Sequence, residues 1–124
     1  MIRQTVFLAA SYTASAASKS FMASPHRGLR LFLDVNGVSG TSPTADFSVQ
    51  VYDPLGAVWS SLGGASFVQA TAAGQQTLTI YPGIAETANV SVSDHIGGEY
   101  RVNFTIGGSD TPTLNFSLSA ELLP

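Results

Sequence analysis

Two stretches of alternating apolar and polar residues constrain the fold more than any other feature of this sequence. Every second residue in 29–35 is Leu or Val, and the apolar residues in 100–106 alternate in the same way. A period of two is typical of a half-buried antiparallel strand, because successive side chains point to opposite faces. Each run is followed by a segment rich in Gly, Ser, Thr and Pro and by a second alternating run. Residues 29–51 and 100–122 therefore each predict a β-hairpin.

The two stretches also resemble each other. Residues 42–50, SPTADFSVQ, align with residues 111–119, TPTLNFSLS, which indicates two similar hairpins related by an approximate two-fold axis, through duplication or through convergence on one hairpin chemistry. Short strands, turn residues and the lack of a helical period predict an all-β protein, an antiparallel β-sandwich of the jelly-roll or Ig-like type. About seven or eight strands fit this length. We expect one domain, with residues 1–24 as an N-terminal strand and extended arm and residues 25–124 as the sandwich.

Charge is scarce along the whole chain. Charged residues make up 10% of the sequence, against about 25% in average soluble domains. Either neighbouring subunits cover much of the surface, or the surface is neutral and rich in Ser, Thr and Gly. We favour assembly, as a homo-oligomer such as a trimer or dimer. The net charge of −3 and the single lysine, Lys19, leave no basic stripe for nucleic acid or for an acidic membrane surface.

The sequence contains no pattern typical of catalysis or of metal binding. Only His26 and His95 are residues of the type that serves as a general base near neutral pH. Asp94 precedes His95, but neighbours on a strand point to opposite faces, so this pair is a weak basis for a dyad. A Gly-x-Ser-x-Gly elbow, a calcium loop and cysteine are all absent. We therefore predict no catalytic residue, no metal and no cofactor.

Five residues are candidates for contacts with a partner. Residues 11–24 are rich in small side chains that pack closely against another backbone, with two aromatic residues among them. A third aromatic residue lies on the polar face of the strand at 29–35. Residues 82–98 lack a clear period, and segments of this length usually belong to an interface or a functional loop. The candidates are Tyr12, Phe21, Phe32, Ile84 and His95.

Several motifs resemble a group of small all-β virion proteins of tailed bacteriophages and prophages. They are LRLFLDV at 29–35, VSGTSPT at 38–44, VQVYDP at 49–54 and RVNFTIGG at 101–108. The resemblance covers residues 27–120. It implies a structural component of a particle and supplies no catalytic residue.

These observations lead to an expected function as a capsid decoration or cement protein. Such a protein would bind between major capsid subunits, and it would be found in the virion after assembly in the cytoplasm of the host bacterium. Small, chemically inert proteins can stabilise a shell through weak contacts repeated many times. We expect residues 11–24 and 82–98 to carry these contacts.

Other functions remain open. Within a virion, the chain could instead be a neck, tail or fibre-base protein. A carbohydrate-binding β-sandwich is an alternative of another class, and it requires exposed, coplanar aromatic rings for sugar stacking. The rings available for this are Trp59, Tyr52, Tyr81 and Tyr100. An enzyme would require His26 or His95 in a cleft beside a carboxylate and a serine.

Overall fold

The computed structural model describes residues 2–124, which form eight β-strands and no helix. The strands are β1 (Ile2–Tyr12), β2 (Ala16–Ala17), β3 (Phe21–Met22), β4 (Gly28–Asp53), β5 (Val58–Ser66), β6 (Gly74–Ile80), β7 (Ser91–Val92) and β8 (Glu99–Leu123). Only β6 and β7 pair in parallel, and the other strand pairs described are antiparallel. The predicted all-β class and strand number are confirmed.

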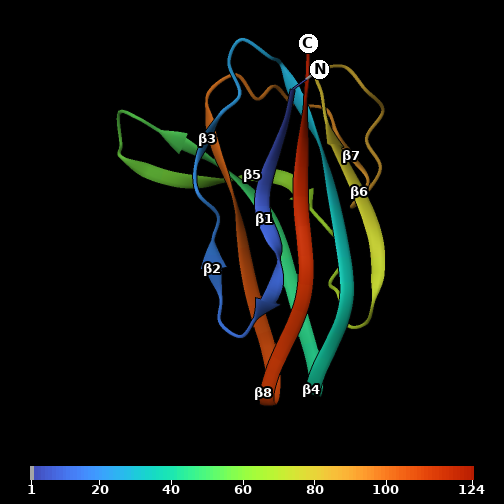
Figure 1. The fold of residues 1–124 in the computed structure, drawn as a ribbon. Coiled ribbons are helices and arrows are strands. Elements are labelled where there is room, and N and C mark those ends of the chain that lie inside the picture. Colours follow the sequence, from blue (N-terminus) through green and yellow to red (C-terminus); the bar gives the residue numbers. More distant parts are fainter. Residues whose placement is uncertain (1) are drawn as a thin grey trace.

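Two long strands, β4 and β8, form the frame of the molecule. Each runs the length of the body, bends sharply at one end and returns (Figure 1). Residues 28–39 of β4 pair with residues 113–123 of β8, and residues 44–51 pair with residues 100–107. The bends thus create two facing layers. The first layer has the order β1-β8-β4-β6-β7, and the second contains the other halves of β8 and β4, with β2 and β3 beside β8 and β5 beside β4.

The two predicted hairpins do not form, and this prediction was wrong. In a hairpin, the two runs within residues 29–51 would bond to each other. Instead, each run bonds to the other long strand, and the two runs of one strand belong to opposite layers (Figure 1). The alternation of apolar residues is the same in both arrangements, because the inward positions are apolar in either case.

Side chains from both layers fill the space between them. Near the bends the core is aromatic: the rings of Phe47 and Phe104 stack with centroids 5.0 Å apart, and Phe116 lies within 5.0 Å of both. Phe7 of β1 packs edge-on against Phe116 at 5.4 Å. Farther from the bends the core is aliphatic, with Leu29, Leu31, Leu33, Leu78, Ile80 and Leu118 fully buried. A single chain therefore supplies both sides of its hydrophobic core.

The strand register bears out the internal repeat. Phe47 pairs with Phe104, and a shift of 69 residues leads to Phe116 and Val35, which also pair. The same shift exchanges the pair Val49–Val102 for Leu118 and Leu33, which are also paired. An approximate two-fold axis therefore relates the two halves of the β4–β8 ladder.

The bends use the same packing twice. Gly40 has a φ of +100°, and a Cβ atom there would lie 2.9 Å from the Cα of Pro112. Gly108 has a φ of +117°, and a Cβ atom there would lie 3.0 Å from the Cα of Pro43. Glycine is favoured at both positions, because L side chains rarely adopt this backbone conformation and because no space remains for one.

The segment of residues 13–24 is extended and lies along β8 of its own chain. Both of its short strands, β2 and β3, pair with β8, and the backbone N–H of Ser18 donates to the carbonyl of Val102 at 2.8 Å. The accessible surface is 6269 Å², close to the roughly 6,300 Å² expected for a compact monomer of this mass. The segment is therefore part of the compact body.

Candidate functional site

Three charged side chains form a row across the outer face of the first layer. The register places Arg3 of β1, Glu121 of β8 and Arg30 of β4 side by side. Glu121 is 6% exposed. Its Oε2 lies 3.5 Å from Nε of Arg3, and its Oε1 lies 3.6 Å from Nη1 of Arg30. Nε of Arg30 also donates to Oγ1 of Thr79 at 3.2 Å. Because two cations share one carboxylate, this row carries a net positive charge.

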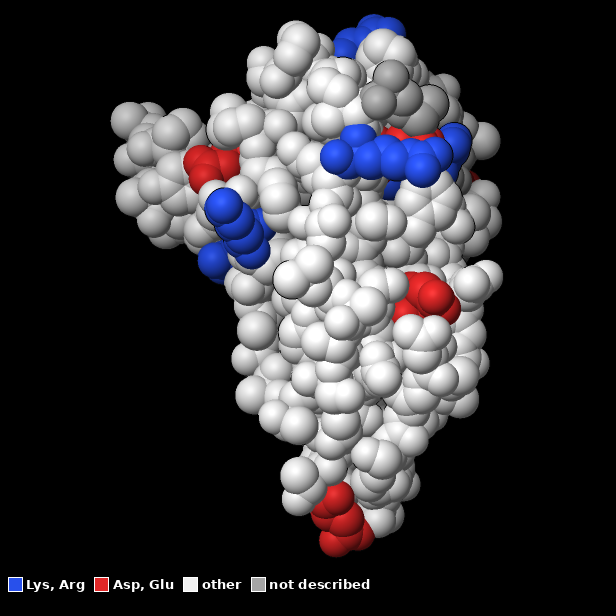
Figure 2. Space-filling model, in the orientation of Figure 1, with Lys and Arg blue, Asp and Glu red and all other residues white. Residues whose placement is uncertain are grey.

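Phe32 lies beside this row, two residues farther along β4. Its ring is 39% exposed, and it lines a hollow of about 250 Å³ together with Arg3 and Ser119. Asp34 follows on the same face, and no cationic side chain of residues 2–124 lies within 4 Å of its carboxylate. Figure 2 shows a row of basic side chains on one face of the molecule, separate acidic groups below it and uncharged surface between them.

A hairpin formed by the end of β4 and the start of β5 projects from the second layer (Figure 1). At its tip, the Asp53 carboxylate accepts hydrogen bonds from the backbone N–H groups of Leu55 and Gly56 at 3.0 and 3.1 Å. These bonds fix the turn, and the Leu55 side chain is left 96% exposed. The tip therefore presents an apolar side chain on a rigid turn.

The stem of this hairpin carries the only tryptophan of the chain. The Arg101 guanidinium lies over the Trp59 ring, 4.4 Å from its centroid, and Nε of Arg101 donates to Oε1 of Gln50 at 2.7 Å. The Tyr52 ring is inclined by 53° to that of Trp59, and Tyr100 is fully buried. These residues do not form the coplanar stacking face that sugar binding requires.

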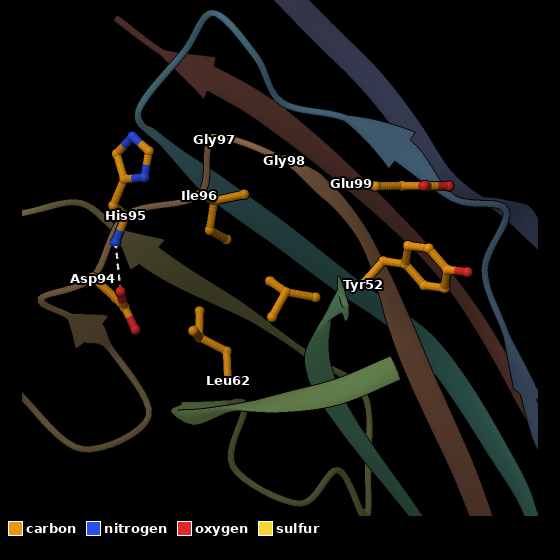
Figure 3. Close-up of a pocket in the computed structure, with 9 residues that line it drawn as sticks. Tyr52, Leu62, Asp94, His95, Ile96, Gly97, Gly98 and Glu99 are labelled. Carbon is orange, nitrogen blue, oxygen red and sulfur yellow. Dashed lines mark hydrogen bonds between the residues drawn. The ribbon is translucent and has the colours of Figure 1, made fainter. Parts of the chain in front are cut away.

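A hollow of about 510 Å³ lies between the hairpin stem and residues 94–99 (Figure 3). Leu62 and Ile96 contribute apolar side chains to it, and Asp94 and His95 lie at its rim. The Asp94 carboxylate accepts a hydrogen bond from the backbone N–H of His95 at 2.7 Å. Figure 3 shows that the His95 ring points away from this carboxylate, so the two side chains do not form a dyad.

The other histidine, His26, lies in the sequence next to Arg27, whose carbonyl accepts a hydrogen bond from the backbone N–H of Ile96 at 2.8 Å. Nδ1 of His26 is buried and has no hydrogen-bond partner among the described residues.

In residues 2–124, no three side chains of His, Asp or Glu are placed to hold a metal ion. The same residues contain no helix long and apolar enough to cross a membrane.

The five candidate contact residues lie on different surfaces. Tyr12 and Phe21 are half-buried against their own core: the Tyr12 ring lies 4.5 Å from that of Phe116, and the Phe21 ring lies 5.7 Å from that of Tyr100. Phe32 is exposed on the first layer. Ile84 is half-buried and lines a groove with Arg30 and Thr79, and His95 is exposed at the rim of the 510 Å³ hollow.

The charged members of the first-layer face were not singled out from the sequence. Arg30, Phe32 and Asp34 occupy successive outward positions of one alternating strand, and this pattern could have identified them. The link from Arg3 through Glu121 to Arg30 could not be predicted, because it depends on the order of three strands.

No protein-family model matches this chain, and no curated protein matches it either. Among solved structures, the SPBc2 prophage-derived protein YomS is similar over 97% of this chain and 94% of that chain. The sequence identity is 11% and the TM-score is 0.42.

Proposed function

We propose that this chain is a structural protein of a phage particle, a decoration or cement protein that binds between major capsid subunits and stabilises the head. It acts by binding alone, without a catalytic residue, metal or cofactor, and it resides in the virion after assembly in the bacterial cytoplasm. The sequence resemblance across residues 27–120 supports a particle component.

The observation that carries this proposal is the projecting β4–β5 hairpin. Leu55 at its tip is 96% exposed and Val58 is 52% exposed, whereas the core between the layers is filled without them. Burying a Leu side chain stabilises a contact by about 1.5–3 kcal/mol. Such a contact is weak alone, but it is sufficient where a symmetric shell holds many copies at high effective concentration.

The scarcity of charge supports the same function. Only 10% of the residues are charged, and a free monomer usually carries more charge for solubility. Residues 11–24, which we expected from the sequence to share this contact, pair with β8 of their own chain. We therefore assign the contact with the shell to the hairpin tip and to residues 82–98, where Val90 is 52% exposed. Covering uncharged groups costs less hydration free energy than covering charged ones.

The test is co-sedimentation of the purified chain with separated heads and tails of a phage that lacks it. We expect binding to heads, weakened at least about tenfold by Leu55→Asp, because a charge would replace the buried side chain. Val68→Asp is the matched control, since Val68 is also exposed, at 57%, but lies away from the tip. Binding to tails or necks would support the neck, tail or fibre-base alternative, and binding to neither would overturn the virion proposal.

A further inference from the structure

Three side chains on the outer face of the first layer follow one another in the order cation, ring, anion. They are Arg30, Phe32 and Asp34, at every second position of β4, with buried Leu31 and Leu33 between them. Successive outward positions lie about 7 Å apart along a strand. Because β4 is the middle strand of the first layer, Phe32 lies near the centre of this face.

The two ends of this line carry opposite charge that is not balanced within the chain. At one end, Arg3 and Arg30 share the single carboxylate of Glu121, which leaves one positive charge in surplus. At the other end, the Asp34 carboxylate has no cation within 4 Å among residues 2–124. The face therefore has a basic end and an acidic end of equal and opposite net charge.

We propose that this face binds the same face of a second copy of the chain. The two-fold axis would run between the copies, perpendicular to β4 and level with Phe32. Reversing the strand direction in this way places Arg30 of each copy opposite Asp34 of the other, and brings the two Phe32 rings together. An interface of this kind is self-complementary, as a two-fold axis requires.

The rest of the face allows close approach of two sheets. The residues around Phe32 on neighbouring strands are small and polar, namely Thr5, Ser117, Ser119 and Thr77. Sheets pack face to face about 10 Å apart when short side chains lie between them. Any pairing that set Arg30 opposite Arg30 would place like charges together and would be disfavoured.

The size of the face sets the strength of this dimer. Four strands, β1, β8, β4 and β6, span about 19 Å at ordinary strand spacing. Over a similar length, the flat area is about 400 Å² per copy, below the roughly 800 Å² per partner of a standard interface. Interfaces of this size are typical of weak, transient complexes, so we expect a dissociation constant above about 1 µM. The dimer is a property of the isolated chain and does not depend on the virion proposal.

The experiment is sedimentation velocity of the whole chain over a series from about 1 µM to about 1 mM. The wild type is expected to dimerise with rising concentration. Asp34→Lys should weaken the dimer at least about tenfold, because the new lysine of each copy would face Arg30 of the other, so that the repulsion occurs at two places in the interface. Arg30→Glu should weaken it in the same way. A mixture of these two variants should restore dimerisation, since in the mixed dimer every facing pair is of opposite charge.

Glu86→Lys is the matched control, because it makes the same change of charge at an exposed position in residues 82–98. It should leave the dimer unchanged, and Phe32→Ser should weaken it. If Arg30→Glu does not fold, Arg30→Gln replaces it. Its mixture with Asp34→Lys should still associate more tightly than either variant alone. A monomeric wild type, a fully dimeric Asp34→Lys variant or a mixture without rescue would each overturn the face-to-face dimer.

Discussion

At the scale of single residues, Tyr100 shows how a polar group is accommodated in the core. Its side chain is fully buried, and its hydroxyl donates a hydrogen bond to Oε1 of Gln4 at 2.8 Å. This bond joins β8 to β1 across the side of the sandwich. Burial raises the pKa of the Tyr100 hydroxyl well above its ordinary value of 10.0, because the charged phenolate would lose its hydration.

The raised pKa of Tyr100 predicts a loss of stability at alkaline pH. Above the ordinary pKa of 10.0, the unfolded chain releases the proton of this residue while the folded protein retains it. The folded state then binds more protons, so the free energy of unfolding falls as the pH rises, and below that pH the contribution is constant. Tyr100→Phe should cost about 1 kcal/mol at pH 7 for the lost hydrogen bond and should reduce the alkaline decline. Urea unfolding of both proteins between neutral and alkaline pH measures this, and parallel declines would contradict it.

For the candidate contact residues, the sequence pattern predicted which side chain is exposed to solvent better than it predicted which side chains pack against the protein's own core. The outward position of Phe32 follows from the alternation, and the ring is exposed. Tyr12 and Phe21 lie in a segment without such a pattern, and nothing local to the sequence indicates that their rings pack against Phe116 and Tyr100. Contacts of this kind depend on packing between segments far apart in the sequence, and the alternation of apolar and polar residues does not reveal them.

At the scale of elements, β1 departs from simple alternation. Val6 and Phe7 are adjacent in sequence, yet both are buried, at 6% and 7% exposure. The register against β8 shifts between Thr5 and Phe7 and again between Phe7 and Ala10. A bulge at these points turns consecutive side chains toward the same face, which brings Phe7 into the aromatic core and leaves Leu8 72% exposed.

This bulge predicts opposite outcomes for two neighbouring substitutions. Phe7→Ala should lower the free energy of unfolding by about 3–5 kcal/mol, because it leaves a cavity beside Phe104 and Phe116. Leu8→Ala should change it by less than about 0.5 kcal/mol, because this side chain lies in water. Chemical denaturation of the two variants compares them directly. Equal losses would show that β1 does not have this register in solution.

The positions of the long strands were largely predictable from the sequence, but the strands with which they pair were not. The alternation in residues 29–51 and 100–122 correctly identified the inward side chains, since Leu31, Phe47 and Phe104 are fully buried. It could not identify the bends, because a Gly/Ser/Thr/Pro segment suits a tight hairpin turn as well as a bend between layers. The partners of each run lie on the other long strand, far away in the sequence, and the alternation within one strand does not identify them.

At the scale of the whole molecule, the approximate two-fold symmetry makes the two bends equivalent. Gly40→Ala and Gly108→Ala should each lower the free energy of unfolding by about 1–3 kcal/mol, because both force a side chain into a positive φ against the opposite strand. Gly37→Ala is the control, since a Cβ atom there meets nothing within 4 Å. Thermal or urea unfolding gives the three values. A large loss at only one of the two bends would show that the symmetry is confined to the backbone.

The sharing of β4 and β8 between both layers has a mechanical consequence. In a sandwich whose layers are joined only by loops, one layer can slide over the other when it is pulled. Here such sliding would have to break the ladder at the bends, where residues 39–44 of β4 cross residues 107–113 of β8. A load applied to one layer therefore passes directly into the other, and the molecule responds to it as a single stiff block.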